Sequence, residues 1–187
     1  GELDVLQTLR DVGLHVEDTS MGERRDLGYL DLLVRPDDTD DSNMRVAIEM
    51  KNVREVQKRD RDEFERKVAD GVSRNLFDAA IFISIRAHTK MGSPVVLRMF
   101  PDDGNRPLVP VTWLGTERAK TVSPLTQEQV ETHVFMMLSL LTQCHNIRRD
   151  LCNGLRDEHV ERLQGFVDTA NDGLNETFVD LSRQSKL

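Results

Sequence analysis

Charged side chains interrupt two apolar segments that otherwise have the composition of buried strands. Asp31 lies within GYLDLLV (residues 28–34), and Glu49 and Lys51 lie within RVAIEMKN (residues 45–52). A charge inside an apolar strand is costly unless an opposite charge, a hydrogen bond or a metal ion compensates it. The fold therefore has to supply compensation at these positions, and this requirement is the strongest constraint on its architecture.

Alternation along the second segment predicts which side chains share a face of the sheet. In a strand over residues 44–52, Ala47, Glu49 and Lys51 fall on one face, and Val46, Ile48 and Met50 fall on the other. The sequence therefore predicts two ionisable groups side by side on one strand.

The preceding strand, residues 27–35, is predicted to pair with this one as a hairpin across the acidic loop of residues 36–43. Symmetric pairing about the loop gives partner numbers that sum to about 79 or 80. This register places Asp31 beside Ile48 or Glu49, so we expect the two carboxylates to be neighbours.

Neighbouring carboxylates repel each other unless one is protonated or a cation neutralises them. Asp31, Glu49 and the backbone carbonyl of Met50 are predicted to bind Mg²⁺ or Mn²⁺, with water and a substrate phosphate completing an oxygen shell. Lys51 is predicted to hold the attacking water and to neutralise charge in the transition state. The alternative is a chance motif with solvent-facing carboxylates, because 31% of the chain is charged.

The hydrophobic patterns predict an α/β domain followed by a helical segment. The predicted elements are a helix over residues 2–12, strands over 14–19, 27–35 and 44–52, a helix over 59–74, and strands over 79–85, 95–100 and 108–114. Residues 1–115 are predicted to form one domain and residues 116–187 a helical appendage for packing or oligomerisation. The pair Asn153-Gly154 favours a helical hairpin, and a single long helix is the alternative.

The element order and the motif Asp31, then Glu49-Met50-Lys51, resemble the PD-(D/E)XK nuclease superfamily. The likeness covers roughly residues 2–114. It implies a restriction-endonuclease-like α-β-β-β-α-β core with a mixed sheet. Leu30 occupies the position of the proline that names the superfamily. The implied activity is Mg²⁺- or Mn²⁺-dependent endonucleolytic cleavage of DNA, in repair or recombination or as the cleavage module of a larger protein.

The first residues, ELDVLQTLRDVGL, together with IEMK at residues 48–51, are similar to archaeal Holliday-junction resolvases. That similarity implies that Glu2 is an additional catalytic metal ligand. A glutamate in the first turn of a helix is also favoured by the helix dipole alone. Glu17 and Asp26 are the alternative ligands, because each lies near the end of a predicted strand.

Other residues are weaker candidates for contacts with phosphate. They are Arg24, Arg25, Arg86, His88 and Lys90. The first two lie in a turn where, by the resemblance, nucleases carry a substrate-gripping loop, and the others follow the strand over residues 79–85. A polar loop of mixed charge is the alternative for the latter group.

The net charge of −8 argues against a sequence-independent coat protein for nucleic acid, because affinity for phosphate comes from Lys and Arg. A catalytically inactive, nuclease-like module that binds nucleic acid or assembles is therefore the alternative function. The expected partners are DNA and further copies of the chain, bound through residues 124–187. We expect no membrane span and an intracellular location, cytoplasmic or nuclear, and the missing initiator Met suggests a piece of a larger protein.

Overall fold

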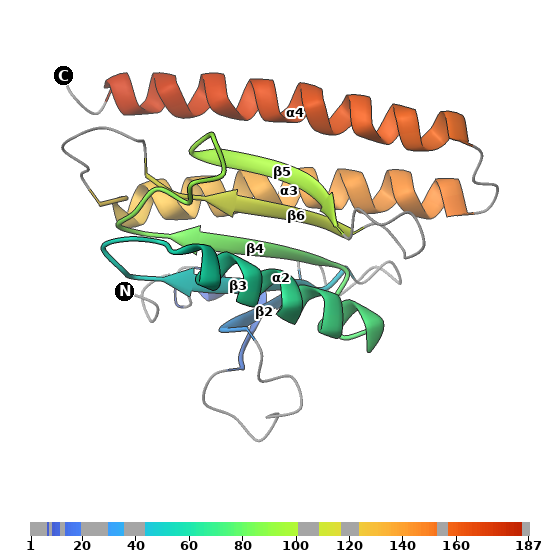
Figure 1. Ribbon diagram of the computed structural model, residues 1–187, viewed down its shortest axis with the longest axis horizontal. Coiled ribbons are helices and arrows are strands. Elements are labelled where there is room, and N and C mark those ends of the chain that lie inside the picture. The colour runs from blue at the N-terminus through green and yellow to red at the C-terminus, as the bar shows by residue number, and fades with distance from the viewer. Residues whose placement is uncertain are drawn as a thin grey trace.

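The computed structural model describes residues 7, 9–11, 14–19, 30–35, 44–100, 109–116, 124–152 and 157–184, with the backbone alone at 147–152, 157–160 and 177–184. Over these residues the chain forms a mixed six-stranded sheet with helices on both of its faces (Figure 1). The predicted α/β class is confirmed. The finer restriction-endonuclease-like core stays a prediction.

The elements follow the predicted order, with small differences in their bounds. They are β1 (His15–Asp18), β2 (Leu32–Arg35), β3 (Val46–Lys51), α2 (Lys58–Ser73), β4 (Ala79–Ser84), β5 (Val95–Phe100), β6 (Val109–Leu114), α3 (Gln127–Cys152) and α4 (Asp157–Gln184). Of the helix predicted over residues 2–12, residues 7 and 9–11 are described and are helical. Strand β2 begins at Leu32, so Asp31 lies just before the strand and not within it.

The strands lie in the order β1-β2-β3-β4-β6-β5. β1, β2 and β3 are antiparallel neighbours, β3, β4 and β6 run parallel, and β5 is antiparallel to β6. Leu32 stands opposite Ile48 and Val34 opposite Val46, which confirms the predicted hairpin register. All six residues of β4 are buried, as expected for an apolar strand covered on both faces.

Helix α2 covers one face of the sheet and the helices α3 and α4 pack on the other, as Figure 1 shows with α2 in front and α3 behind. Phe64 and Val68 of α2 pack on the face formed by Leu33, Ala47, Phe82 and Trp113. On the other face, Val34, Ile48 and Ile81 of the sheet share a core with Val134, Met137 and Leu141 of α3 and with Val167 and Leu174 of α4. The charged face of β3 therefore lies on the α2 side.

Helices α3 and α4 are separate helices that contact each other and run in opposite directions (Figure 1). Of the two sequence-based alternatives, the hairpin is thus the one observed. In the part of the chain that the structure describes, no helix is long and apolar enough to cross a membrane.

The end of α2 is fixed by its packing on Phe77. A Cβ placed on Gly71 would lie 2.2 Å from Cε1 of Phe77, so only glycine allows this close approach. Asn75 then adopts a positive φ of 55°, and the N–H of Leu76 donates to the carbonyl of Gly71 at 2.9 Å. This left-handed cap ends the helix and sets its position over the sheet.

The edge strand β5 is held by a side chain of α4. The backbone N–H of Leu97 donates to Oδ1 of Asn171 at 2.6 Å, and Nδ2 of Asn171 donates to the carbonyl of Leu97 at 2.8 Å. One carboxamide thus satisfies both backbone groups of an edge residue.

Candidate functional site

Asp31, Glu49 and Lys51 lie on the α2 side of the sheet. Their alternation partners Leu33 and Ala47 belong to the core beneath α2, which sets the direction in which this face points. The structure brings the three predicted residues together at the ends of β2 and β3.

Asp31 is fixed between two strands. Its backbone N–H donates to the carbonyl of Ile48 at 2.9 Å, and its carbonyl accepts the N–H of Thr19 at 3.1 Å. Its side-chain Oδ2 accepts the backbone N–H of Met50 at 2.7 Å. The carboxylate therefore turns toward β3, where it lies close enough to Lys51 for its negative charge to help raise the pKa of that lysine.

Glu49 is a buried carboxylate, with a residue exposure of 2%. Nζ of Lys51 lies 2.6 Å from its Oε1, and Nζ of Lys67 lies 3.2 Å from both of its carboxylate oxygens. A carboxylate this deeply buried requires strong compensation. Two ammonium groups provide it.

Lys67 was missed by the sequence-based reasoning. It belongs to α2, where it lies three residues after Phe64 and four before Gly71, both of which are buried. Residues at these spacings share one face of a helix. A lysine on the apolar face of α2 was the signal that could have identified it.

Lys51 keeps its charge in this setting. Burial lowers the pKa of Lys51, but the hydrogen bond and charge of Glu49, with the charges of Asp31 and Glu63, outweigh burial and raise the pKa above its usual value. Lys51 is therefore a cation at neutral pH, suited to attracting a phosphate and not to accepting a proton.

The donor set is compatible with a divalent cation. Asp31, just before β2, and Glu49, on β3, present carboxylate oxygens, the ligand type that Mg²⁺ prefers. Within the described ranges, no group of three or more His, Cys, Asp or Glu side chains could hold a metal ion, so these residues supply only a partial ligand set. Glu2, the further predicted ligand, lies outside the described residues.

An unsatisfied hydroxyl group lies beside this cluster. Ser84 stands opposite Lys51 in the register of β3 and β4, and its side chain is fully buried. Among the described residues, its Oγ has no hydrogen-bond partner. Buried hydroxyl groups are normally paired with protein or water, so the unpaired Oγ of Ser84 is an uncompensated polar atom on the same face of the sheet as Lys51.

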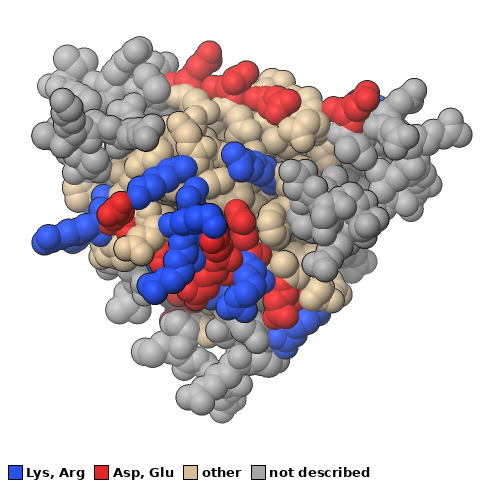
Figure 2. Space-filling model, in the orientation of Figure 1, with Lys and Arg blue, Asp and Glu red and all other residues tan. Residues whose placement is uncertain are grey.

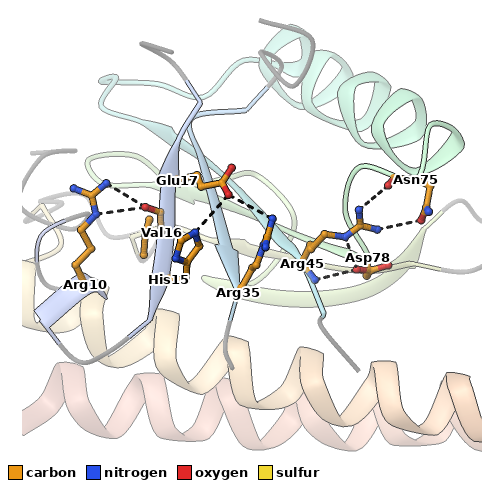
Figure 3. A network of polar contacts seen from close by, with 8 residues as sticks. All are labelled: Arg10, His15, Val16, Glu17, Arg35, Arg45, Asn75 and Asp78. Atoms are coloured by element: carbon orange, nitrogen blue, oxygen red, sulfur yellow. Dashed lines mark hydrogen bonds and ion pairs between the residues drawn. The ribbon is translucent and has the colours of Figure 1, made fainter. Parts of the chain in front are cut away.

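Glu17 is engaged elsewhere. Its Oε1 lies 3.4 Å from the guanidinium of Arg35 and 3.5 Å from Nε2 of His15, as Figure 3 shows. The structure therefore gives Glu17 partners of its own at the other end of β2. Asp26, the second alternative ligand, lies outside the described residues, as do Arg24 and Arg25.

Of the candidate phosphate-binding residues after β4, Arg86 is exposed, and His88 accepts the backbone N–H of Lys90 at 2.8 Å. Nζ of Lys90 lies 2.5 Å from Oε1 of Glu55. The structure thus places these residues in a loop beside the start of α2, and their role in binding phosphate stays a prediction.

A surface pocket of about 240 Å³ lies beside this loop. Its lining residues are Lys58, Arg61, Asp62, Glu65, Lys90, Met91 and Arg98. Figure 2 shows Lys and Arg side chains interleaved with acidic ones over α2, whereas acidic side chains follow α4 at the top of the view. In the stretch of α4 whose side chains are described, residues 161–176, the exposed acidic residues are Glu161, Asp168, Asp172 and Glu176. A polyanion would therefore meet less repulsion over α2 than over α4.

No protein-family model, curated protein or solved structure matches this chain in the comparisons with known proteins. The resemblance to the PD-(D/E)XK superfamily consequently rests on the motif residues and the order of elements.

Proposed function

We propose that this chain hydrolyses phosphodiester bonds of DNA with the help of Mg²⁺ or Mn²⁺. The observation that carries the proposal is the convergence of Asp31, Glu49 and Lys51 on one face of the sheet. Asp31 is oriented by its 2.7 Å hydrogen bond from Met50, and Glu49 is bound to Lys51 at 2.6 Å.

In this proposal Asp31, Glu49, the carbonyl of Met50 and Glu2 hold the metal ion. A bound divalent cation supplies an acidified water molecule and polarises a phosphoryl oxygen. Lys51 attracts the scissile phosphate, positions the water and stabilises the negative charge that develops on the phosphoryl oxygens. The backbone bonds of Asp31 to Thr19 and Ile48 fix its main chain, and the N–H of Met50 holds its carboxylate in one orientation.

A cleavage assay tests the proposal. Linear, branched and single-stranded DNA are incubated with wild type and with Lys51→Met, in Mg²⁺, in Mn²⁺ and in chelator. Wild type should cut at least one DNA form only with metal, and K51M should lose at least about 100-fold in rate, as expected when charge stabilisation is removed. Arg162→Met is the control, because Arg162 is exposed on α4, which packs on the opposite face of the sheet from the site. Metal-independent cutting, or equal rates for wild type and K51M, would contradict the proposal.

One observation favours a second candidate function. Glu49 already has two ammonium partners, so the Asp31, Glu49, Lys51 and Lys67 cluster is charge-balanced without a metal ion. The same geometry suits an inactive nuclease-like module that binds nucleic acid or assembles through residues 124–187. Calorimetric titration with Mn²⁺ separates the two, because this second candidate requires that the wild-type protein bind no ion at the site.

A further inference from the structure

We infer that Lys67 occupies the position of the metal ion on Glu49 and moves to Glu63 when the ion binds. This inference rests on the proposed metal site and adds a residue that controls access to it. It makes Lys67 a positioning residue, because it acts on the metal through Glu49.

The geometry of Lys67 resembles that of a bound cation. Its Nζ lies 3.2 Å from Oε1 and 3.2 Å from Oε2 of Glu49, so it bridges both oxygens symmetrically. Lys51 differs, since its short contact is to Oε1. A cation that used both oxygens of Glu49 would have to displace the ammonium group of Lys67.

The charge balance favours withdrawal of one of the two lysines when a divalent ion binds. Asp31, Glu49 and the neighbouring Glu63 carry three negative charges, and Lys51 and Lys67 carry two positive ones, so an added divalent ion leaves one excess positive charge around a buried carboxylate. The side chain of Glu49 is 3% exposed and that of Lys67 is 15% exposed. Like charges at this depth are poorly screened by water.

Lys67 has an alternative partner on its own helix, which identifies it as the group that moves. Nζ of Lys67 also lies 3.6 Å from Oε1 of Glu63, one helical turn earlier, and the side chain of Glu63 is 48% exposed. A change of side-chain torsions is enough to transfer the ammonium group from the buried carboxylate to this exposed one. The helix backbone does not need to move.

The inference predicts opposite effects for two substitutions in α2. Lys67→Met removes the competing cation, so Mn²⁺ should bind on the order of tenfold more tightly than to wild type. Glu63→Gln removes the alternative partner of Lys67, so Mn²⁺ should bind about two- to threefold more weakly, since an exposed ion pair is weak. Lys67→Arg keeps a cation with two parallel donors on Glu49 and should also weaken Mn²⁺ binding.

The experiment is calorimetric titration of the metal-free full chain with Mn²⁺, with thermal unfolding to establish that each variant is folded. Lys58→Met and Asp62→Asn are matched controls, because they form the other short lysine pair at i,i+4 spacing on α2 at 3.0 Å. Both should leave Mn²⁺ affinity within about twofold of wild type.

The outcomes separate this inference from the proposed function. If wild type binds Mn²⁺ and K67M binds it no more tightly, the inference is overturned and the metal site stands. If only K67M binds Mn²⁺, Lys67 blocks the cation position and does not yield it, so the inferred move to Glu63 is overturned and the wild-type protein fits the inactive module. If no variant binds Mn²⁺, both are overturned. Should K67M fail to fold, weaker binding by E63Q and K67R supports the inference, and unchanged or tighter binding by them contradicts it.

Discussion

Asp31 and Met50 are joined by a hydrogen bond in which Oδ2 of the carboxylate accepts the backbone N–H at 2.7 Å. This contact gives Asp31 a structural role next to the catalytic one proposed for it. A substitution at this position therefore affects folding and activity for different reasons, and the two effects can be separated experimentally.

Asp31→Ala should lower the free energy of unfolding by about 1–3 kcal/mol, because the N–H of Met50 loses its acceptor. Asp31→Asn retains an acceptor oxygen and should cost less than about 1 kcal/mol, while it removes the charge proposed to bind metal. Denaturant titrations and Mg²⁺-dependent DNA cleavage measure the two effects. D31N protein that is folded and cuts DNA at the wild-type rate would show that Asp31 is not catalytic.

Gly71→Ala should destabilise the protein by about 1–3 kcal/mol, although alanine is the better helix former, because the new methyl group overlaps the ring of Phe77. Gly165→Ala in α4 is the control. A Cβ there meets nothing within 4 Å, so this change should stabilise the protein by about 0.5–1 kcal/mol. Chemical denaturation of both variants tests the packing of α2, and a stabilised G71A protein would show that the contact with Phe77 is wrong.

His133 should make stability depend on pH. Burial lowers the pKa of His133, and its hydrogen bond to the carbonyl of Gln129 offsets this only in part. Below the unfolded pKa of about 6.5 the unfolded chain binds a proton that the folded chain resists, so stability falls as pH decreases from there toward the folded pKa.

Unfolding free energies of wild type and His133→Gln, measured between about pH 5 and 7.5, test this prediction. The stability difference between them should change over this range, with wild type losing more on acidification. Parallel pH profiles for the two proteins would contradict the prediction, because they would mean that His133 has the same pKa in the folded and the unfolded state.

Cys144 should resist thiol reagents in the folded protein. Its side chain is buried, and burial raises its pKa to about 12, so almost no thiolate is present at pH 8. In a Cys152→Ser background, a chromogenic disulfide reagent should react with one thiol per chain in denaturant and with almost none in buffer. Complete reaction of the native protein within minutes would contradict the packing of α3.

The sequence predicted the sheet side of the site because strands have a rigid alternation. A period of two sets the face of Glu49 and Lys51, and hairpin pairing sets their distance from Asp31, so neither depends on distant parts of the chain. The position of Lys67 relative to Glu49, in contrast, depends on how α2 is rotated over the sheet. Phe64 and the close contact of Gly71 with Phe77 determine that rotation, and it is a property of tertiary packing.

The surfaces on which α3 and α4 pack also could not be predicted from local sequence patterns. The apolar stripes of α3 and α4 show that these helices must be covered, but they do not show whether another chain or the sheet covers them. In the structure, Met137 and Val167 pack into the same core as Ile48 and Ile81. Binding to a second copy of the chain through residues 124–187 stays a prediction.

The carboxamide of Asn171 has a consequence for the behaviour of the whole molecule. β5 ends the sheet, and an exposed edge strand offers its N–H and C=O groups as a template on which another chain can add a strand. At Leu97 both groups are already bonded to Asn171, whose amide imitates the next strand. Helix α4 therefore blocks edge-to-edge pairing at this point and limits sheet-mediated aggregation, a safeguard that would be lost together with the helix.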